Sequence, residues 1–251
     1  MSLVRSGLQQ IRRLIDRAGY NVYPKADHFV SDQVDLLGGA SAPVIFDVGA
    51  NEGKLAQTYR KHFPDARIFC LEPIPHFAAR LRASQPSAEV IESALASEDG
   101  TASFFVNAFE DTSSLLQSDL GSMPQSYRPM MQPKDSIKVR TAKLDTLMGQ
   151  FGLDTIGILK MDIQGGEYNA LKGAAQALER KGIAIIALEV FLEAYYADQR
   201  LFGEIASLLA QYGYHLHRLY NINFSGTSGR PQWADAIFVP DESASFAPQS
   251  R

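Results

Sequence analysis

The chain has 251 residues, of which 45% are hydrophobic, and a formal net charge of −4. A chain of this size and composition can bury one sizeable core, so one domain is favoured over two. The acidic balance argues against a broad nucleic-acid surface, because neutralising phosphates requires clustered Lys and Arg. We therefore expect no nucleic-acid partner and a small or neutral ligand instead.

The cysteine content and the hydropathy of the sequence indicate in which cellular compartment the protein is expected. The only cysteine, Cys70, rules out an internal disulfide and is typical of a reducing environment. The N-terminus carries charges throughout instead of the apolar core of an export signal. The longest apolar run, residues 183–192, is interrupted by Glu189 and is far shorter than the ~20 residues that span a bilayer. We expect a cytoplasmic protein without a transmembrane segment.

Residues 1–40 are interpreted as an N-terminal helical extension. Within residues 1–19, apolar side chains recur at helical spacing opposite Arg and Gln side chains, which predicts an amphipathic helix with a basic face. Packing against the domain, or against a second subunit as in a homodimer, is the favoured interpretation. A lid over the active site comes next, and peripheral contact with an anionic membrane is least favoured. A short helix is expected over residues 27–37.

Residues 41–240 are expected to form one α/β domain, followed by a flexible tail at 241–251. Buried apolar runs alternate with amphipathic stretches, which predicts a doubly wound, mostly parallel sheet. The expected strands are 44–47, 67–72, 89–93, 156–162 and 183–190, and the first two helices after residue 41 are 54–62 and 75–83.

The most informative stretch is residues 44–73, which runs from the first strand to the end of the second. Gly49 and Gly53 lack a Cβ, so the backbone can turn sharply and a ligand can approach the start of the next helix. Glu72 lies nineteen residues beyond Gly53, close to the ~20-residue offset at which a carboxylate meets a ribose diol. The stretch therefore predicts a nucleoside-cofactor site.

The residues of this turn limit the range of cofactors that it can bind. Its glycine spacing differs from the G-x-G-x-x-G that favours a pyrophosphate. Asp47 and Glu52 would repel a diphosphate, whereas a sulfonium-bearing amino acid joined to adenosine is a tolerable ligand. The turn resembles motif I, and Glu72 the acid that follows it, of class I S-adenosylmethionine-dependent methyltransferases.

Residues 97–154 depart from the alternating pattern. Segments 101–107 and 137–143 alternate polar and apolar side chains, so we expect an antiparallel addition at one sheet edge, between strands three and four. The intervening residues 113–135 hold three prolines and three methionines with little periodicity. They predict a loop over the cofactor or substrate, with local disorder as the alternative.

The second informative segment is residues 159–168. Asp162 ends the fourth strand at the carboxyl edge of the sheet, where an open α/β sheet places its ligand crevice. Gly165 and Gly166 let the chain turn into a helix with an apolar face. Glu167, near the start of that helix, is expected to interact favourably with the helix dipole.

The C-terminal part predicts a helix over residues 201–212 and two strands, 215–220 and 233–239. A polar, glycine-containing loop joins the strands, which is typical of an antiparallel hairpin. A dehydrogenase of Rossmann type would usually continue with parallel units instead.

Taken in order, these segments resemble the FkbM family of S-adenosylmethionine-dependent methyltransferases, over roughly residues 40–240. The resemblance implies a class I methyltransferase (Rossmann-like) fold and O-methylation of a hydroxyl on a sugar, glycan or polyketide-like small molecule. It is carried by FDVGANEG (46–53), LEP (71–73), SSL (113–115), KLDTL (143–147), LKMDIQGGEYNALKGA (159–174) and WADAIF (233–238).

The expected site residues follow from these motifs and from their place at strand ends. The turn after the first strand is assigned to the methionine end of S-adenosyl-L-methionine, and Glu72 to the ribose. The cofactor-binding residues expected are Asp47, Gly49, Asn51, Gly53, Glu72, Ser93, Ala94 and Asp162. For orienting or deprotonating the acceptor hydroxyl, Asp162 is the first candidate, Glu189 the second, and His76 a weaker third.

A divalent metal is an option that the sequence does not favour. The family often has Glu where this chain has Gln164, so a base or metal-ligand role cannot be transferred to this position. A metal would need oxygen ligands from Asp162 with Glu189 or Asp235, and no spacing secures that set.

Two other functions stay open. A nicotinamide-dependent oxidoreductase would share the fold class, although the missing third glycine and the terminal hairpin argue against it. A methyltransferase-fold binding protein could keep the cofactor without catalysis. The acceptor molecule cannot be identified from the sequence.

Overall fold

A computed structural model of the chain describes residues 28–226 and 228–241. The predicted helix at 1–19 and nearly all of the predicted tail lie outside these described residues. Among the described helices, none is long and apolar enough to cross a membrane. The helices are α2 (His28–Leu36), α3 (Lys54–His62), α4 (Pro75–Ser84), the 3₁₀ helix η1 (Glu110–Thr112), α5 (Arg128–Met131), α6 (Leu144–Gln150), α7 (Glu167–Lys172), α8 (Ala175–Glu179) and α9 (Phe202–Gln211).

Seven strands form the main sheet, in the spatial order β3-β2-β1-β7-β8-β10-β9. The pairs from β3 through β8 are parallel, and β10 runs antiparallel to both β8 and β9. These strands are β1 (Val44–Val48), β2 (Arg67–Leu71), β3 (Glu89–Ile91), β7 (Ile156–Met161), β8 (Ile183–Phe191), β9 (Tyr214–Phe224) and β10 (Pro231–Pro240). The predicted doubly wound class I methyltransferase fold with its closing hairpin is confirmed.

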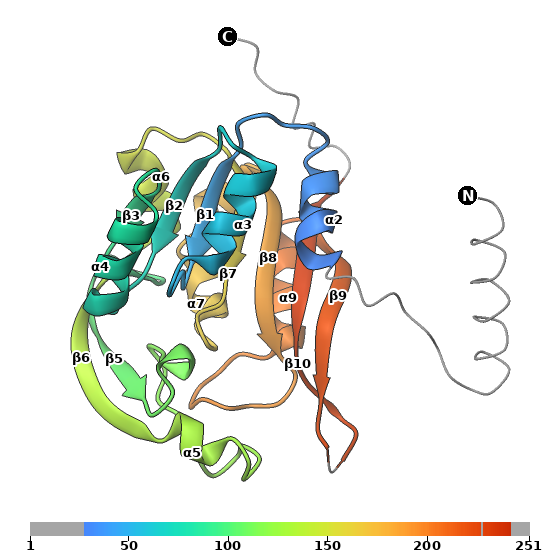
Figure 1. The fold of residues 1–251 in the computed structure, drawn as a ribbon. Helices are drawn as coiled ribbons and strands as arrows, with labels where there is room; N and C mark the ends of the chain where they lie inside the picture. The colour runs from blue at the N-terminus through green and yellow to red at the C-terminus, as the bar shows by residue number, and fades with distance from the viewer. Residues whose placement is uncertain (1–27, 227, 242–251) are drawn as a thin grey trace, which may run out of the picture.

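The inserted segment forms a sheet of its own, which differs from the predicted addition at one edge of the main sheet. β5 (Gly100–Asn107) and β6 (Pro133–Ala142) pair antiparallel, as their alternation predicted. β4 (Ala94–Leu95) then pairs parallel with β6 to give the order β4-β6-β5. This second sheet lies beyond the carboxyl ends of β1 and β2 (Figure 1). The predicted strand over 89–93 ends early because the chain leaves the main sheet to join this second sheet.

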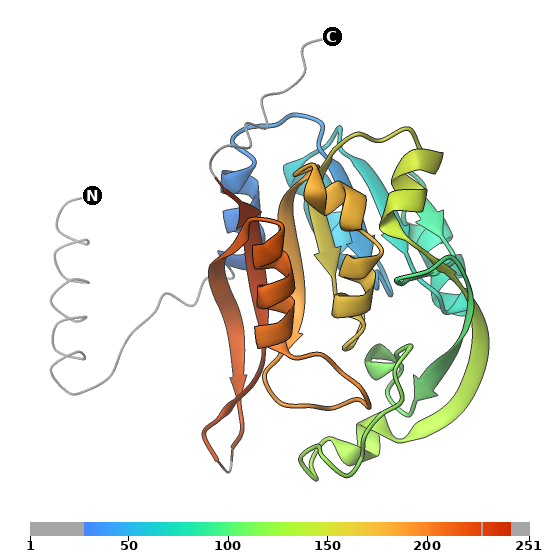
Figure 2. The same ribbon diagram turned by 180° about the vertical axis from the view of Figure 1, so that it is seen from behind.

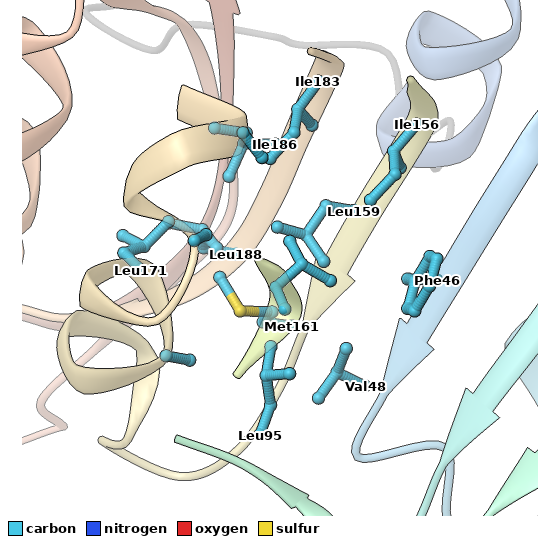
Figure 3. Close-up of a cluster of buried hydrophobic side chains, with 14 of the residues drawn as sticks. Phe46, Val48, Leu95, Ile156, Leu159, Met161, Leu171, Ile183, Ile186 and Leu188 are labelled. Atoms are coloured by element: carbon cyan, nitrogen blue, oxygen red, sulfur yellow. The ribbon is translucent and has the colours of Figure 1, made fainter. Parts of the chain in front are cut away.

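Helices cover both faces of the main sheet (Figures 1 and 2). α2, α3 and α4 contribute apolar side chains to the core on one face, and α6, α7, α8 and α9 contribute to the core on the other. Figure 3 shows part of the second core, where Leu159 and Met161 of β7 meet Leu188 of β8 and Leu171 of α7. Burying each such side chain contributes about 1.5–3 kcal/mol. This double layer fixes the strand ends that carry the polar residues.

The helix expected after Gly166 is interrupted. α7 ends at Lys172 and α8 starts at Ala175, with Gly173 between them. A Cβ at Gly173 would collide with the backbone oxygen of Ala96, just after β4. The break therefore lets the second sheet approach the helical layer.

Candidate active site

A cleft opens at the carboxyl ends of β1, β2 and β7. Its walls surround about 590 Å³ of space not filled by atoms, part of which is open to solvent. Six of the eight residues predicted to bind the cofactor line it, namely Gly49, Asn51, Glu72, Ser93, Ala94 and Asp162. These six residues come from four separate stretches of the chain.

The turn after β1 requires glycine at position 49. Gly49 has φ +74°, and a Cβ there would collide with the backbone oxygen of Asp162. The backbone N–H groups of Gly49 and Ala50 both donate to the oxygen of Leu71, at 3.0 and 3.1 Å. The turn is therefore bonded to the end of β2 while it crosses directly over the end of β7.

Glu72 is held by two backbone N–H groups. Its Oε1 accepts a hydrogen bond from Ile74 and its Oε2 one from Asn51, each at 2.9 Å. The side chain is buried, and burial raises its pKa against the effect of these two bonds. Each carboxylate oxygen keeps capacity to accept another hydrogen bond, so Glu72 can receive two hydroxyl donors from a ligand in the cleft.

Asn51 extends the polar rim of the cleft. Its backbone is left-handed, with φ +47°, and its Nδ2 donates to Oδ1 of Asp111 at 2.7 Å. Its Oδ1 is buried and has no hydrogen-bond partner among the described residues. Such an atom carries a cost unless a ligand donates to it. Asp111, from η1, was not predicted from the sequence.

The other wall of the cleft is apolar. Ile74, Phe77, Ala94 and Phe104 form a small buried cluster in which α4 meets the second sheet. Ser93 lies at its edge, and its Oγ donates to the backbone oxygen of Arg140 at 3.0 Å. A flat apolar ring system fits such a wall, with few polar groups to fix its orientation.

Asp47 and Gly53, the other two predicted cofactor residues, do not line the cleft. Asp47 lies inside β1, so its side chain points into the sheet face covered by α3; it is fully buried, 3.5 Å from Nζ of Lys160. Burial raises the pKa of Asp47, and Lys160 opposes that shift. Gly53 precedes α3 with φ +77°, and a Cβ there would press on Leu81 of α4. Both residues therefore lie next to the turn after β1 but on the side away from the cleft.

Asp162 stands at the mouth of the cleft, with its side chain 42% exposed. Lys160 lies behind it, with Nζ 3.9 Å from Oδ2. Burial lowers the pKa of Lys160, but Asp47 and Asp162 outweigh this and leave it raised. The lysine therefore remains a cation between two carboxylates.

Gln164 connects Asp162 to Glu189 of β8. Its Nε2 donates to Oδ1 of Asp162 at 2.9 Å and to Oε2 of Glu189 at 2.8 Å. The hydroxyl of Tyr196 lies 2.8 Å from Oε1 of Gln164. The backbone of Gln164 is left-handed, with φ +56°, a conformation that costs about 1–2 kcal/mol in a residue other than glycine. The network holds this strained residue in place.

Glu189, the second candidate base, lies behind Gln164 and does not line the cleft. Burial, followed by the charges of Asp162, Glu167 and Asp235, raises its pKa well above the ordinary value. Glu167 is also buried, and its Oε1 accepts from the backbone N–H of Ile163 at 2.9 Å. That bond braces the loop after β7, a role that the predicted dipole interaction did not include.

The third candidate base, His76, is removed from this network. Its side chain is about half exposed, and its Nε2 lies 3.1 Å from Oε2 of Glu110 on the outer rim. Among the described residues, no group of three or more His, Cys, Asp or Glu side chains could hold a metal ion.

Two further polar contacts hold the network of Asp162, Gln164 and Glu189 to neighbouring loops. The sequence of these loops contains no motif that predicts such contacts. Ser114 donates through Oγ to the backbone oxygen of Gln164 at 2.8 Å, and Tyr196 lies 2.8 Å from the backbone oxygen of Thr112. Only the SSL element hinted at Ser114. Tyr196 and Lys160 could have been found only as polar atoms near the ends of strands.

The comparison with known families settles which enzymes this site belongs with. The Methyltransferase FkbM domain model matches residues 47–216, more than half of the chain. The chain belongs to the FkbM methyltransferase family. The matched segment begins in β1 and includes every cleft residue named above, whereas α2 and β10 fall outside it.

Two curated proteins are similar in sequence. The 2-O-methyltransferase NoeI of Sinorhizobium fredii is 28% identical over 169 residues, which cover 64% of this chain and 65% of NoeI. The AMB antimetabolite synthetase AmbE of Pseudomonas aeruginosa is 23% identical over 241 residues, which cover 82% of this chain and 11% of AmbE. The chain thus spans less than two thirds of the length of either relative.

Solved structures include more distant likenesses. A putative sarcosine dimethylglycine methyltransferase from Galdieria sulphuraria is 11% identical, with a TM-score of 0.49, and the match covers 85% of this chain and 84% of that one. The precorrin-6y C5,15-methyltransferase of Geobacter metallireducens is 13% identical, with a TM-score of 0.46, covering 89% and 95%.

Proposed function

We propose that this FkbM-family protein transfers a methyl group from S-adenosyl-L-methionine to a hydroxyl of a sugar, glycan or polyketide-like small molecule. The observation that carries the proposal is the cleft itself, in which a buried carboxylate (Glu72) and a partly exposed one (Asp162) face a common space. The family match supports methyl transfer over the nicotinamide-dependent alternative.

The residues present fit this cofactor. Glu72 would accept both hydroxyls of the ribose, and the wall of Ile74, Phe77 and Phe104 would cover the adenine. The orphaned Oδ1 of Asn51 would accept a hydrogen bond from the ammonium group of the methionine portion. Among the residues that the structure describes, neither Lys nor Arg lines the cleft, which suits a ligand with a cationic sulfonium better than one with phosphates.

S-adenosyl-L-methionine, when bound, supplies an electrophilic methyl group on sulfur. The chain must hold the acceptor hydroxyl in line with the carbon–sulfur bond, because positioning makes the encounter effectively unimolecular. Asp162 would accept the proton of the acceptor hydroxyl as that oxygen is methylated, and would then release it to solvent. Asp162 suits this role because its carboxylate is partly exposed and is oriented by Gln164.

The choice of oxygen as the methylated atom is supported by one of the similar proteins. NoeI is named a 2-O-methyltransferase, which favours oxygen as the methylated atom here. We expect a cytoplasmic enzyme with a neutral acceptor, and a homodimer is compatible with the amphipathic N-terminal stretch.

The test is turnover with a panel of hydroxylated acceptors, comprising free sugars, oligosaccharides and polyketide alcohols, followed through S-adenosylhomocysteine. Wild-type protein should bind S-adenosyl-L-methionine by calorimetry and turn over with a member of the panel. Binding without turnover across the panel would favour the non-catalytic binding protein, and preference for NADH would overturn the cofactor.

Asp162→Asn separates binding from chemistry. Because asparagine keeps an oxygen for Gln164 but is not a base, we expect kcat to fall by about 10²–10⁴ while cofactor affinity changes little. Glu98→Asn, on an exposed loop, serves as the control and should behave as wild type. Full turnover in the Asp162 variant would remove this residue from the mechanism.

A further inference from the structure

The floor of the site brings two carboxylates to one nitrogen atom. Nε2 of Gln164 lies within hydrogen-bond distance of Oδ1 of Asp162 and Oε2 of Glu189. Two carboxylates that converge on one point normally require a shared proton or a cation between them. Here both amide hydrogens of one side chain take that place.

The orientation of the carboxamide follows from the two carboxyl groups, which accept from its NH₂ group. A flipped carboxamide would point its oxygen at Asp162 and Glu189 instead. At the other end, the buried Tyr196 hydroxyl lies 2.8 Å from Oε1 of Gln164 and 2.8 Å from the backbone oxygen of Thr112, so its single hydrogen can be donated to one of these two acceptors at a time.

None of the other charged groups described around Gln164 bridges Asp162 and Glu189. Lys160 reaches Asp162 from behind at 3.9 Å, but its shorter contact, at 3.5 Å, is to Asp47. Glu167 and Asp235 add negative charge around Glu189. The amide is thus the group that directly bridges Asp162 and Glu189.

We infer that Gln164 is a positioning residue which occupies, with an N–H donor, the point between Asp162 and Glu189 that a divalent cation would otherwise take, so that Asp162 is oriented for methyl transfer without a metal. The catalytic part of this inference rests on the proposed function. The metal part does not, since it concerns only how three side chains of the free protein are arranged.

The replacement Gln164→Glu makes the inference testable. The isosteric carboxylate would place a third oxygen ligand at the position of Nε2, beside Asp162 and Glu189. Three carboxylates in contact repel one another unless a proton or a cation joins them. A site with three oxygen ligands of this kind suits Mg²⁺ or Mn²⁺.

The probe is Mn²⁺, titrated into full-length protein and followed by electron paramagnetic resonance. Wild type should bind no Mn²⁺ between Asp162 and Glu189. Gln164→Glu should gain one site there, with an affinity at least about tenfold higher than that of any Mn²⁺ binding by the wild type. Adding Glu189→Gln to the Gln164→Glu variant should abolish the gain. Wild-type binding that disappears in Asp162→Asn or Glu189→Gln would overturn the inference, as would a folded Gln164→Glu variant that gains no site.

Gln164→Met provides a neutral counterpart in case the acidic variant fails to fold. It removes both hydrogen bonds, adds no oxygen ligand and keeps the point between the two carboxyl groups filled, so it should bind no Mn²⁺ and should lower kcat while leaving the KM for S-adenosyl-L-methionine within about threefold. An unchanged kcat in this variant would contradict the positioning role. If wild type itself has no turnover, the proposed function fails, whereas the Mn²⁺ comparison still decides the metal part of the inference.

Discussion

The close approach of Gly49 to β7 decides the shape of the cleft. A β-carbon at this position has no room beside the backbone oxygen of Asp162, and the positive φ adds strain for any other residue. The turn and the end of β7 therefore approach closely only because position 49 has no side chain.

We predict that Gly49→Ala loses measurable S-adenosyl-L-methionine binding in calorimetry and lowers the melting temperature. The matched control is Gly152→Ala, since Gly152 also has a positive φ, of +64°, but has nothing within 4 Å of the added Cβ. In the control, the free energy of unfolding should fall only by the backbone strain of about 1–2 kcal/mol, and the cofactor should bind normally. Equal losses in both variants would show that the contact with β7 is unimportant.

Glu167 gives a prediction about pH. Burial raises its pKa to about 7, whereas in the unfolded chain it titrates near the ordinary value of about 4.3. Between these values the native state holds a proton that the unfolded state has released, so this group's contribution to stability falls as pH rises to about 7. Above that pH the charged, buried carboxylate lowers the free energy of unfolding.

Glu167→Gln should therefore stabilise the protein at pH 8, by at most about 4 kcal/mol, and much less at pH 5. Glutamine keeps an oxygen to accept from Ile163, so the brace of the loop is preserved. Urea unfolding at the two pH values measures the difference, with the exposed Glu179→Gln as the control. A stabilisation that does not depend on pH would contradict the assigned cause.

At the residue scale, sequence reasoning worked where a residue directly follows a strand. Glu72 and Asp162 were placed at the cleft because parallel strands end at one edge. Asp47 was assigned to the same rim, but it lies one residue before the end of β1, and its side chain points to the sheet face instead. Partners such as Asp111 and Tyr196 come from loops, and no local pattern marks which strand end a loop will reach.

At the scale of elements, the segment after β5 is attached to the strand ends by few polar contacts. Ser114 is fully buried, donates to the backbone oxygen of Gln164, and accepts from the N–H of Leu116 at 3.0 Å. Removing its hydroxyl leaves both groups without this partner, which costs about 1–3 kcal/mol. The loss should loosen the segment locally.

We predict that Ser114→Ala speeds amide hydrogen exchange in residues 108–120 and in the loop at 163–166, with a small fall in melting temperature. Ser122→Ala lies on the same segment but is exposed, so its exchange pattern should match that of wild type. Unchanged exchange at both places in the Ser114 variant would show that backbone pairing alone holds the segment.

Most elements were predictable because buried parallel strands read as apolar runs and helices show their own period. The second sheet was only half predictable. Alternation revealed β5 and β6, but the third strand is the two-residue β4, too short to carry a pattern. The break between α7 and α8 depends on Ala96, which is distant in sequence from Gly173, so no local signal announced it.

At the scale of the whole molecule, α2 belongs physically to the methyltransferase domain although the motifs begin after it. Phe29 and Val30 are buried in the core on the α3 side of the sheet. Oδ2 of Asp32 accepts hydrogen bonds from Arg218 at 2.8 Å and from the Tyr220 hydroxyl at 2.7 Å. The helix therefore ties the N-terminal region to β9.

We predict that a chain starting at residue 28 keeps the cofactor affinity of the full chain, whereas a chain starting at residue 41 is strongly destabilised. Burial of two large apolar side chains alone contributes about 3–6 kcal/mol. Chemical unfolding and calorimetry on both chains test this. Equal stability of the two would support the expected boundary at residue 41.

The division of the strands between two sheets has a consequence for how this enzyme could diversify. The apolar wall takes Ala94 and Phe104 from the small sheet, whereas the acids at positions 72 and 162 follow strands of the large one. Part of the apolar wall therefore rests on a different sheet from the two acids, whereas Ile74 and Phe77 of the wall follow β2. Substitutions in the small sheet can reshape that part of the wall without moving the two acids.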